Sequence, residues 1–251
     1  MAKLVAMNNP YNTNLDRNPA NFQPLTPLTF LERAASVYPN HTAIIHGKLR
    51  RNYSDFYSRS RQLASALSEQ GIARGDTVSV ILSNTPAMLE AHYGVPMCGA
   101  VLHSINTRLD PDTIAYQLDH ANSKALIVDR EFLKTAKTSL ELAGVSPILI
   151  EFNDSEHPIK ESLPGALEYE EFLLKGDKNY NWLMPEDEWD AISLNYTSGT
   201  TGNPKGVVSH HRGAYLLAQG NAMIASIKKH SVYLWTLPMF HCNGWCFPWT
   251  L

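Results

Sequence analysis

Short apolar stretches alternate with longer amphipathic stretches along most of this chain. Strands are predicted where an aliphatic or β-branched run is bounded by turn residues, and helices where apolar side chains recur three or four positions apart. The predicted strands cover residues 77–82, 100–105, 124–129, 147–152 and 191–196, and the predicted helices between them cover 54–70, 84–98, 110 to about 121, and 131–143. This alternation is typical of an α/β fold in which helices flank layered, mainly parallel sheets.

The beginning of the chain has another pattern. Residues 1–25 are a polar lead-in without the apolar core of a secretory signal or membrane anchor. A hairpin is predicted over 43–53, and its cluster Lys48, Arg50 and Arg51 is interpreted as solvated. Ser54 is the predicted N-cap of the following helix, and Gly71 the residue that ends it. We therefore expect one domain over 26–251 after the lead-in.

An acidic segment interrupts the alternation. Residues 151–190 contain twelve Asp and Glu against three Lys, although the whole chain has a net charge of only −3. The simplest interpretation is a solvated excursion on the surface. Because the net charge of the whole chain is close to zero, the composition also gives no overall positive electrostatic field that would attract nucleic acid.

The end of the sequence is apolar and uncharged. No Asp, Glu, Lys or Arg follows Lys229, and three of the five tryptophans lie there. This composition indicates the interior of a domain that continues, so we expect a fragment. Three cysteines, Cys98, Cys242 and Cys246, favour a reducing compartment inside the cell, and no run is long enough for a transmembrane helix.

A loop rich in glycine and hydroxyl groups follows the predicted strand 191–196. It reads Thr197-Ser-Gly-Thr-Thr-Gly-Asn-Pro-Lys205-Gly, and such a loop can turn its N–H groups toward an anion while the lysine adds charge. A Walker A loop needs lysine directly after its last glycine, and here Lys205 lies three residues after Gly202. The G-x-G-x-x-G spacing of dinucleotide sites is absent as well, which excludes both common phosphate loops.

The segment YTSGTTGNPKGVV resembles the phosphate loop of the adenylate-forming (AMP-binding) superfamily, without departure from Leu194 to Lys205. The resemblance implies an AMP-binding N-terminal domain whose loop holds the phosphates of ATP. The residues implied to bind them are Thr197, Ser198, Gly199, Thr200, Thr201, Gly202 and Lys205.

A second motif, Leu237-Pro-Met-Phe-His-Cys-Asn-Gly-Trp245, is similar to that of plant-type acyl-activating enzymes that make butyryl-, medium-chain acyl-, benzoyl- or cinnamoyl-CoA. The resemblance implies that His241, Asn243, Gly244 and Trp245 bind the acid substrate. By itself a histidine among aromatic residues is more often part of a core. A zinc site at Cys242 and Cys246 lacks a second ligand pair of the usual spacing, so buried thiols are the simpler interpretation.

The residues His210-His211-Arg212, just past the phosphate loop, are predicted to begin a helix that runs to about Ile227. A catalytic role for the histidine pair is an alternative without further support in the sequence. The helix is the preferred interpretation, with Arg212 on its exposed side.

The resemblance implies an acid–CoA ligase that uses ATP, Mg²⁺ and CoA, with a small carboxylic acid as substrate. No catalytic residue and no metal ligand is assigned within the 251 residues, because the family's metal segment, hinge and mobile C-terminal domain with its adenylation lysine are expected beyond them. We therefore expect an inactive fragment, from a protein of the peroxisome or cytoplasm. The alternatives are a non-catalytic nucleotide- or acyl-binding module, a kinase-type phosphate binder, and a peptide-synthetase adenylation domain. The acid and the oligomeric state are left open.

Overall fold

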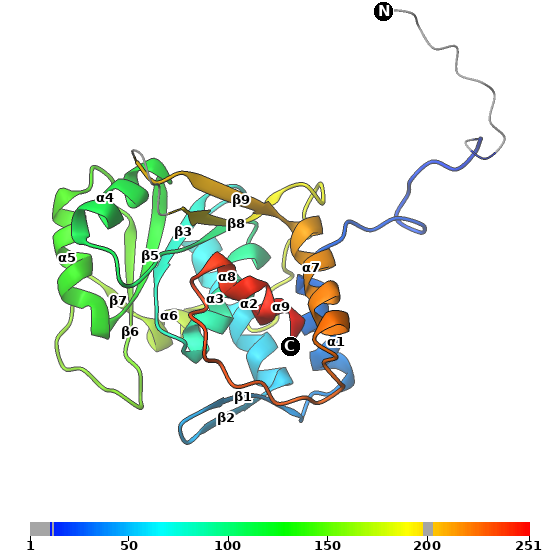
Figure 1. Ribbon diagram of the computed structural model, residues 1–251, viewed down its shortest axis with the longest axis horizontal. Coiled ribbons are helices and arrows are strands. Elements are labelled where there is room, and N and C mark those ends of the chain that lie inside the picture. The colour runs from blue at the N-terminus through cyan, green and yellow to red at the C-terminus, as the bar shows by residue number, and fades with distance from the viewer. Residues whose placement is uncertain (1–10, 12, 198–202) are drawn as a thin grey trace, which may run out of the picture.

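The computed structural model describes residues 11, 13–197 and 203–251. Its main feature is a seven-stranded sheet of order β7-β6-β5-β3-β4-β8-β9, parallel except for the β8–β9 pair, beside a two-stranded β1–β2 hairpin (Figure 1). The strands are β1 (Thr42–His46), β2 (Leu49–Asn52), β3 (Thr77–Ile81), β4 (Val101–Ser104), β5 (Ser123–Asp129), β6 (Ile148–Phe152), β7 (Leu167–Glu168), β8 (Ala191–Tyr196) and β9 (Gly206–His210). The predicted α/β class with a mainly parallel sheet is confirmed.

Helices cover both faces of this sheet, as the alternation of apolar segments predicts. They are α1 (Leu28–Val37), α2 (Tyr53–Glu69), α3 (Pro86–Met97), α4 (Pro111–His120), α5 (Leu133–Leu142), α6 (Tyr169–Lys175), α7 (His211–Ile224), α8 (Cys242–Trp245) and α9 (Phe247–Thr250), with a short 3₁₀ turn η2 (Arg130–Phe132) before α5. In Figure 1, α4 and α5 lie on one side of the sheet and α2 and α3 on the other.

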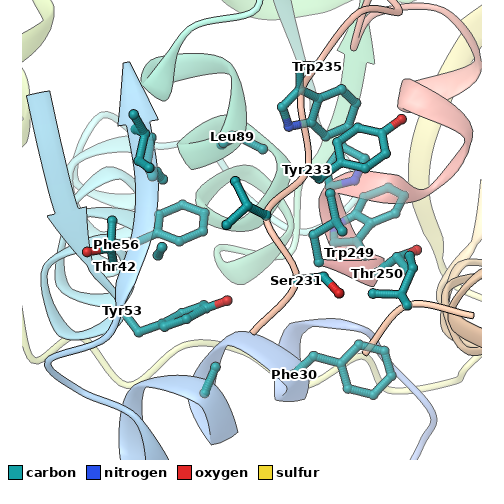
Figure 2. Close-up of a pocket in the computed structure, with 18 of the residues that line it drawn as sticks. Phe30, Thr42, Tyr53, Phe56, Leu89, Ser231, Tyr233, Trp235, Trp249 and Thr250 are labelled. Atoms are coloured by element: carbon teal, nitrogen blue, oxygen red, sulfur yellow. The ribbon is translucent and has the colours of Figure 1, made fainter. Parts of the chain in front are cut away.

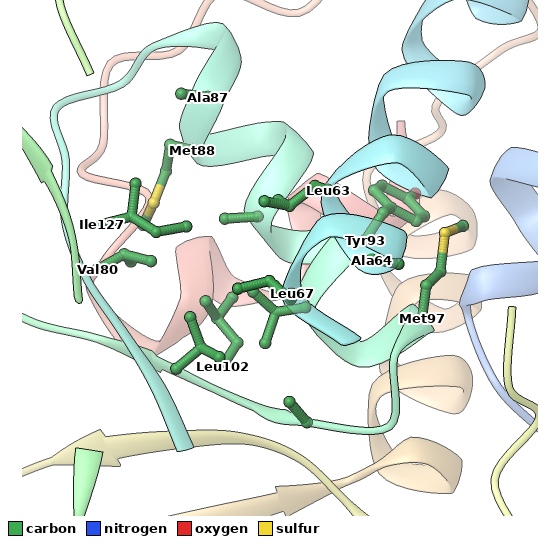
Figure 3. Close-up of a cluster of buried hydrophobic side chains, with 14 of the residues drawn as sticks. Leu63, Ala64, Leu67, Val80, Ala87, Met88, Tyr93, Met97, Leu102 and Ile127 are labelled. Carbon is green, nitrogen blue, oxygen red and sulfur yellow. The ribbon is translucent and has the colours of Figure 1, made fainter. Parts of the chain in front are cut away.

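Two clusters of buried side chains hold the helices to the sheet. Alternate residues of a strand point to opposite faces, so Val80 belongs to the cluster under α2 and α3 while its neighbour Ile81 belongs to the one under α4 and α5. Figure 3 shows the first cluster, where Leu67 of α2 lies close to Leu102 of β4. Burial of these faces is the main favourable contribution to folding.

Most helix ends agree with the sequence predictions. Asp110 caps α4 by accepting a hydrogen bond from the Thr113 N–H at 2.9 Å, and Gly71 follows α2 with a φ of 86°, which favours glycine. The prediction for Ser54 is wrong. Helix α2 begins one residue earlier, and the Asn52 side chain caps it by accepting from the Asp55 N–H at 2.8 Å.

The acidic segment contributes to the interior, which departs from the predicted surface excursion. It contains β7 and α6, and Tyr169, Phe172 and Leu173 of α6 are each at most 1% exposed. These three apolar residues occur at helical spacing, so α6 packs them inward while Glu170 and Glu171 face the solvent side. The net charge of the segment therefore gave no indication that it contains an amphipathic helix.

A buried carboxylate joins α3 to its neighbours. The Glu90 side chain is fully buried and accepts from Arg59 Nε at 2.7 Å, from the Tyr169 hydroxyl at 2.8 Å, and from Arg51. Arg51 is 15% exposed, so its interpretation as part of a solvated hairpin is wrong. The two guanidinium groups compensate a charge that would otherwise be costly to remove from water.

The uncharged end of the sequence is partly buried. Met239 and Trp249 are at most 2% exposed, whereas Val232 and Leu234 are more than 80% exposed in a stretch, residues 225–241, that has no helix or strand. Among the described residues no helix is both long and apolar enough to cross a bilayer.

Candidate functional site

The site is positioned where the order of strands in the sheet reverses. After β3 the chain crosses through α3 to β4, and after β4 it returns through α4 on the opposite face to reach β5 on the other side of β3. Connections that leave adjacent strands toward opposite faces open a crevice at the carboxyl ends of those strands. Strand β8 pairs with β4, so it ends at the same edge.

The predicted phosphate loop begins where β8 ends. Its two sides are joined at the neck because the Thr197 N–H donates to the Lys205 carbonyl at 3.0 Å, and the Lys205 N–H to Thr197 Oγ1 at 3.4 Å. Strand β9, which the sequence reasoning missed, then returns antiparallel to β8 with Gly206 opposite Tyr196. The other implied phosphate-binding residues, Ser198, Gly199, Thr200, Thr201 and Gly202, lie outside the described residues.

Lys205 is exposed at this neck. In the part of the chain that the structure describes, no carboxylate lies within ion-pair distance of its ammonium group. A lysine without an internal partner at the mouth of a glycine-rich loop is available to an anion.

The second motif is tethered to the same edge by two asparagines. The Asn195 side-chain amide, on β8, donates to the Phe240 carbonyl at 3.1 Å and to Ser104 Oγ at 3.0 Å. Asn84 clamps the preceding segment, because it donates to the Leu237 carbonyl and accepts from the Met239 N–H, both at 2.8 Å. The structure thus brings together two motifs that are separated in sequence.

The predicted acid-binding residues occupy a strained turn. Residues Cys242 to Trp245 have φ values from 44° to 56°. At Gly244 a Cβ would lie 3.1 Å from Pro248 and 3.3 Å from Trp235, so both the backbone angle and the limited space favour glycine there. His241 is exposed, and Trp245 is 54% exposed.

Asn243 differs from its neighbours because it is 2% exposed. Neither atom of its side-chain amide has a hydrogen-bond partner among the described residues. A buried amide without partners is unfavourable by about 1–3 kcal/mol, so this position favours a polar ligand or an ordered water.

Comparison with known proteins decides the family. Residues 31–251 match the model of a family described as AMP-binding enzyme. The chain belongs to this family. It is 51% identical over 249 residues to the peroxisomal acetate/butyrate–CoA ligase AAE7 of Arabidopsis thaliana, covering 95% of this chain and 44% of that protein. It is 47% identical over 250 residues to the acetate–CoA ligase CCL3 of Humulus lupulus, covering 94% of this chain and 44% of that protein. The chain therefore spans less than half the length of these curated relatives.

Solved structures support the same fold for this AMP-binding chain. The anthranilate CoA ligase AuaEII, crystallised with anthranoyl-AMP, superposes with a TM-score of 0.77 at 22% identity. The match covers 92% of this chain and 44% of that one. At this identity the likeness concerns the fold alone.

A large cavity lies beside the second motif in the AMP-binding domain. It measures about 620 Å³ and is bordered by α1, β1, the start of α3 and the end of the chain. Figure 2 shows aromatic side chains around it, among them Tyr53, Phe56, Trp235 and Trp249. Thr197, Lys205 and the predicted acid-binding residues do not line this cavity, but Asn84 and Met239, which are hydrogen-bonded to each other beside the second motif, do.

The alternative sites suggested by the sequence gain no support. Within the described residues, no three His, Cys, Asp or Glu side chains are arranged to hold a metal ion. Cys246 is buried as predicted, and burial raises the pKa of its thiol to about 12. The prediction of a buried thiol is wrong for Cys242, which is exposed. His210 caps α7 by accepting from the Gly213 N–H, and His211 is buried with Thr26 as its partner at 2.9 Å. The two histidines thus have structural roles.

Asp129, at the carboxyl end of β5, gives a testable dependence on pH. It is 4% exposed, and burial raises its pKa to about 6, although the hydrogen bond from the Glu131 N–H opposes this effect. Its folded-state pKa lies above the ordinary value near 3.9, so its contribution to stability is complete below pH ~4 and is lost as the pH rises through ~6. Asp129→Asn should therefore raise the free energy of unfolding by about 1–2 kcal/mol at pH 7.5, without a gain at pH 3.5.

Urea denaturation at both pH values measures this difference. An asparagine can still cap η2, where Asp129 accepts from the Glu131 N–H at 3.0 Å. Asp16→Asn, in the exposed lead-in, is the control and should change neither value. Equal effects of Asp129→Asn at the two pH values would contradict the shifted pKa.

Proposed function

We propose that this chain is the ATP- and acid-binding portion of an AMP-forming acid–CoA ligase. The observation that carries the proposal is the convergence at one sheet edge. The loop neck, whose Lys205 forms no ion pair with any described residue, is joined through Asn195 to the motif before His241. Two relatives named as CoA ligases for acetate support it.

The chemistry that this site would serve has two displacements. A carboxylate oxygen of the acid attacks the α-phosphorus of ATP. The bond between that phosphorus and the oxygen that bridges it to the β-phosphate breaks, so that pyrophosphate leaves and an acyl-adenylate forms. The CoA thiolate then attacks the acyl carbon, and AMP leaves with the bonding electron pair as the thioester forms. Activation as a mixed anhydride replaces a poor leaving group by a good one.

Within the proposal, Lys205 and the Thr197 hydroxyl hold the phosphates and neutralise the charge that accumulates on the departing pyrophosphate. Ser198, Gly199, Thr200, Thr201 and Gly202 would add donors from the rest of the loop. Mg²⁺ would enter bound to the phosphates, where it supplies further positive charge. The hydroxyl and ammonium groups at the neck are chemically suited to the phosphates.

His241, Asn243, Gly244 and Trp245 are proposed to receive the acid. The unpaired amide of Asn243 supports this, because its N–H₂ can donate to a carboxylate oxygen and so recover the free energy lost on burial. Gly244 keeps the turn free of a side chain. The names of the two relatives make a short aliphatic acid the first candidate.

The proposal is tested by acid-dependent exchange of labelled pyrophosphate into ATP, measured with the complete gene product. We expect exchange with one or more of acetate, butyrate, benzoate and cinnamate, and thioester formation when CoA is added. Transfer of the γ-phosphate, with ADP as product, would instead indicate a kinase. Binding of ATP without exchange would favour the non-catalytic module.

The 251-residue chain alone is proposed to have negligible ligase activity. The proposal rests on the comparison of lengths, since the chain covers 44% of its relatives. Acid-dependent exchange by this chain in isolation would contradict it. We also propose a peroxisomal or cytoplasmic location, which imaging of an N-terminal fluorescent fusion would test.

A further inference from the structure

Both sides of the phosphate loop touch one turn of α4. On the side of β8, the Tyr196 hydroxyl and Nδ1 of His120 are hydrogen-bonded at 2.7 Å. On the side of β9, the Tyr116 hydroxyl donates to the Pro204 carbonyl at 3.3 Å. Tyr196 immediately precedes Thr197 and Pro204 immediately precedes Lys205, so these bonds hold the backbone beside the two described residues of the predicted phosphate site.

The two α4 residues act from one surface of the helix. Tyr116 and His120 are four positions apart, which places them on the same face, and their rings stack with centroids 5.5 Å apart. The His120 ring also meets the Tyr196 ring edge-on at 5.6 Å. Three rings and two hydrogen bonds thus form a continuous contact between the helix and the loop neck.

This face of α4 is itself held firmly. Ile114 and Leu118 are completely buried against the sheet, and Asp110 caps the helix. At the other end, the Asp119 carboxylate accepts from the N–H groups of Gly144 and Val145 at 2.8 and 2.9 Å. The helix therefore offers a rigid support for a loop rich in glycine.

A buried histidine supports Tyr196 from the strand side. His103 of β4 is fully buried, with its ring 5.1 Å from that of Tyr196 and its Nδ1 2.8 Å from Ser79 Oγ. Burial lowers the pKa of His103 to about 3, so it is neutral at physiological pH. Tyr196 is thus held between β4 and α4.

We propose that Tyr116 and His120 are positioning residues for ATP, which act by fixing the neck of the phosphate loop through Pro204 and Tyr196. The inference deepens the proposed function and rests on it. Ordering a ligand-binding segment when its ligand binds costs free energy. Anchoring both ends lowers that cost and directs Lys205 toward the phosphates.

The test compares Tyr116→Phe and His120→Ala with the unaltered complete gene product. Each variant should raise the KM for ATP in pyrophosphate exchange about five-fold, the loss expected for one hydrogen bond. The KM values for the acid and for CoA should change less than about two-fold, because the anchors lie beside the phosphate loop. His120→Asn should restore most of the ATP affinity, since its amide oxygen reaches the position of Nδ1.

Tyr215→Phe is the matched control. This tyrosine lies on α7, and its hydroxyl accepts from the Gln219 side chain, so the change removes one tyrosine hydrogen bond away from the loop. It should leave all KM values unchanged. Thermal denaturation of every variant separates a positioning role from a loss of stability. A lower melting temperature, together with affinities for ATP, acid and CoA that all decrease by the same factor, would overturn the inference.

Calorimetric titration with ATP gives a second measurement that needs no turnover. Both α4 variants should bind ATP about five-fold more weakly, even where exchange is absent and the proposed ligase function fails. If these variants bind ATP as tightly as the unaltered protein and have the same KM for ATP, the positioning role is overturned. In that case the ligase function still stands, provided that the unaltered protein is active. An unaltered protein that binds no ATP would overturn both.

Discussion

A Lys205→Ala substitution is expected to lower acid-dependent pyrophosphate exchange by the complete gene product by at least about 100-fold. It should also leave the free energy of unfolding within about 0.5 kcal/mol of the unaltered value. Lys205 is exposed, and no described carboxylate forms an ion pair with it, so the folded chain loses no internal partner.

The size of the effect follows from where charge develops. Pyrophosphate gains negative charge as the α-phosphorus is attacked, so an ammonium group beside it stabilises the transition state more than the bound ATP. The Thr197–Lys205 backbone bond at 3.0 Å does not depend on the side chain, so the substitution should leave the neck in place. The loss should therefore appear in kcat and not only in the KM for ATP.

Lys134→Ala is the control for this experiment. Lys134 is exposed on α5, remote from β8, and its removal should leave exchange unchanged. Urea denaturation checks the stability of both variants. Exchange by Lys205→Ala at more than a tenth of the unaltered rate would contradict the assignment of Lys205 to the phosphates.

Glu90→Gln is expected to lower the free energy of unfolding by about 3–5 kcal/mol. The substitution keeps the size of the side chain but removes the buried carboxylate, so that Arg51 and Arg59, which are 15% and 17% exposed, keep only the more exposed Glu170 as a charged partner. The network joins β2, α2, α3 and α6, so its loss affects contacts between elements that are far apart in sequence. Urea denaturation followed by far-ultraviolet circular dichroism measures the change.

Glu170→Gln is the matched control, because Glu170 also pairs with Arg59, at 2.7 Å, but its side chain is 48% exposed. An exposed pair of this kind contributes at most about 1 kcal/mol. Equal effects of the two substitutions would show that burial is not what makes Glu90 important to stability.

Local pattern predicted most of the fold. The alternation of apolar strands with amphipathic helices identified the central strands and the helices α2 to α4, because burial against a two-sided sheet demands that periodicity. It failed for α6, where a high density of acidic residues obscured Tyr169, Phe172 and Leu173. It also missed β9, whose five residues include Val207 and Val208 exposed to solvent.

The sequence by itself determined the class of fold and the membership of the AMP-binding family, and it indicated the position of the proposed phosphate loop, because each of these depends on residue types at fixed spacing along the chain. Only the tertiary structure decided that Asn195 joins the loop to the second motif, that α4 supports the loop neck, and that Arg51 and Arg59 converge on Glu90. These contacts join residues far apart in sequence. Their partners depend on strand order and on which face of the sheet each helix covers, and no local pattern encodes those choices.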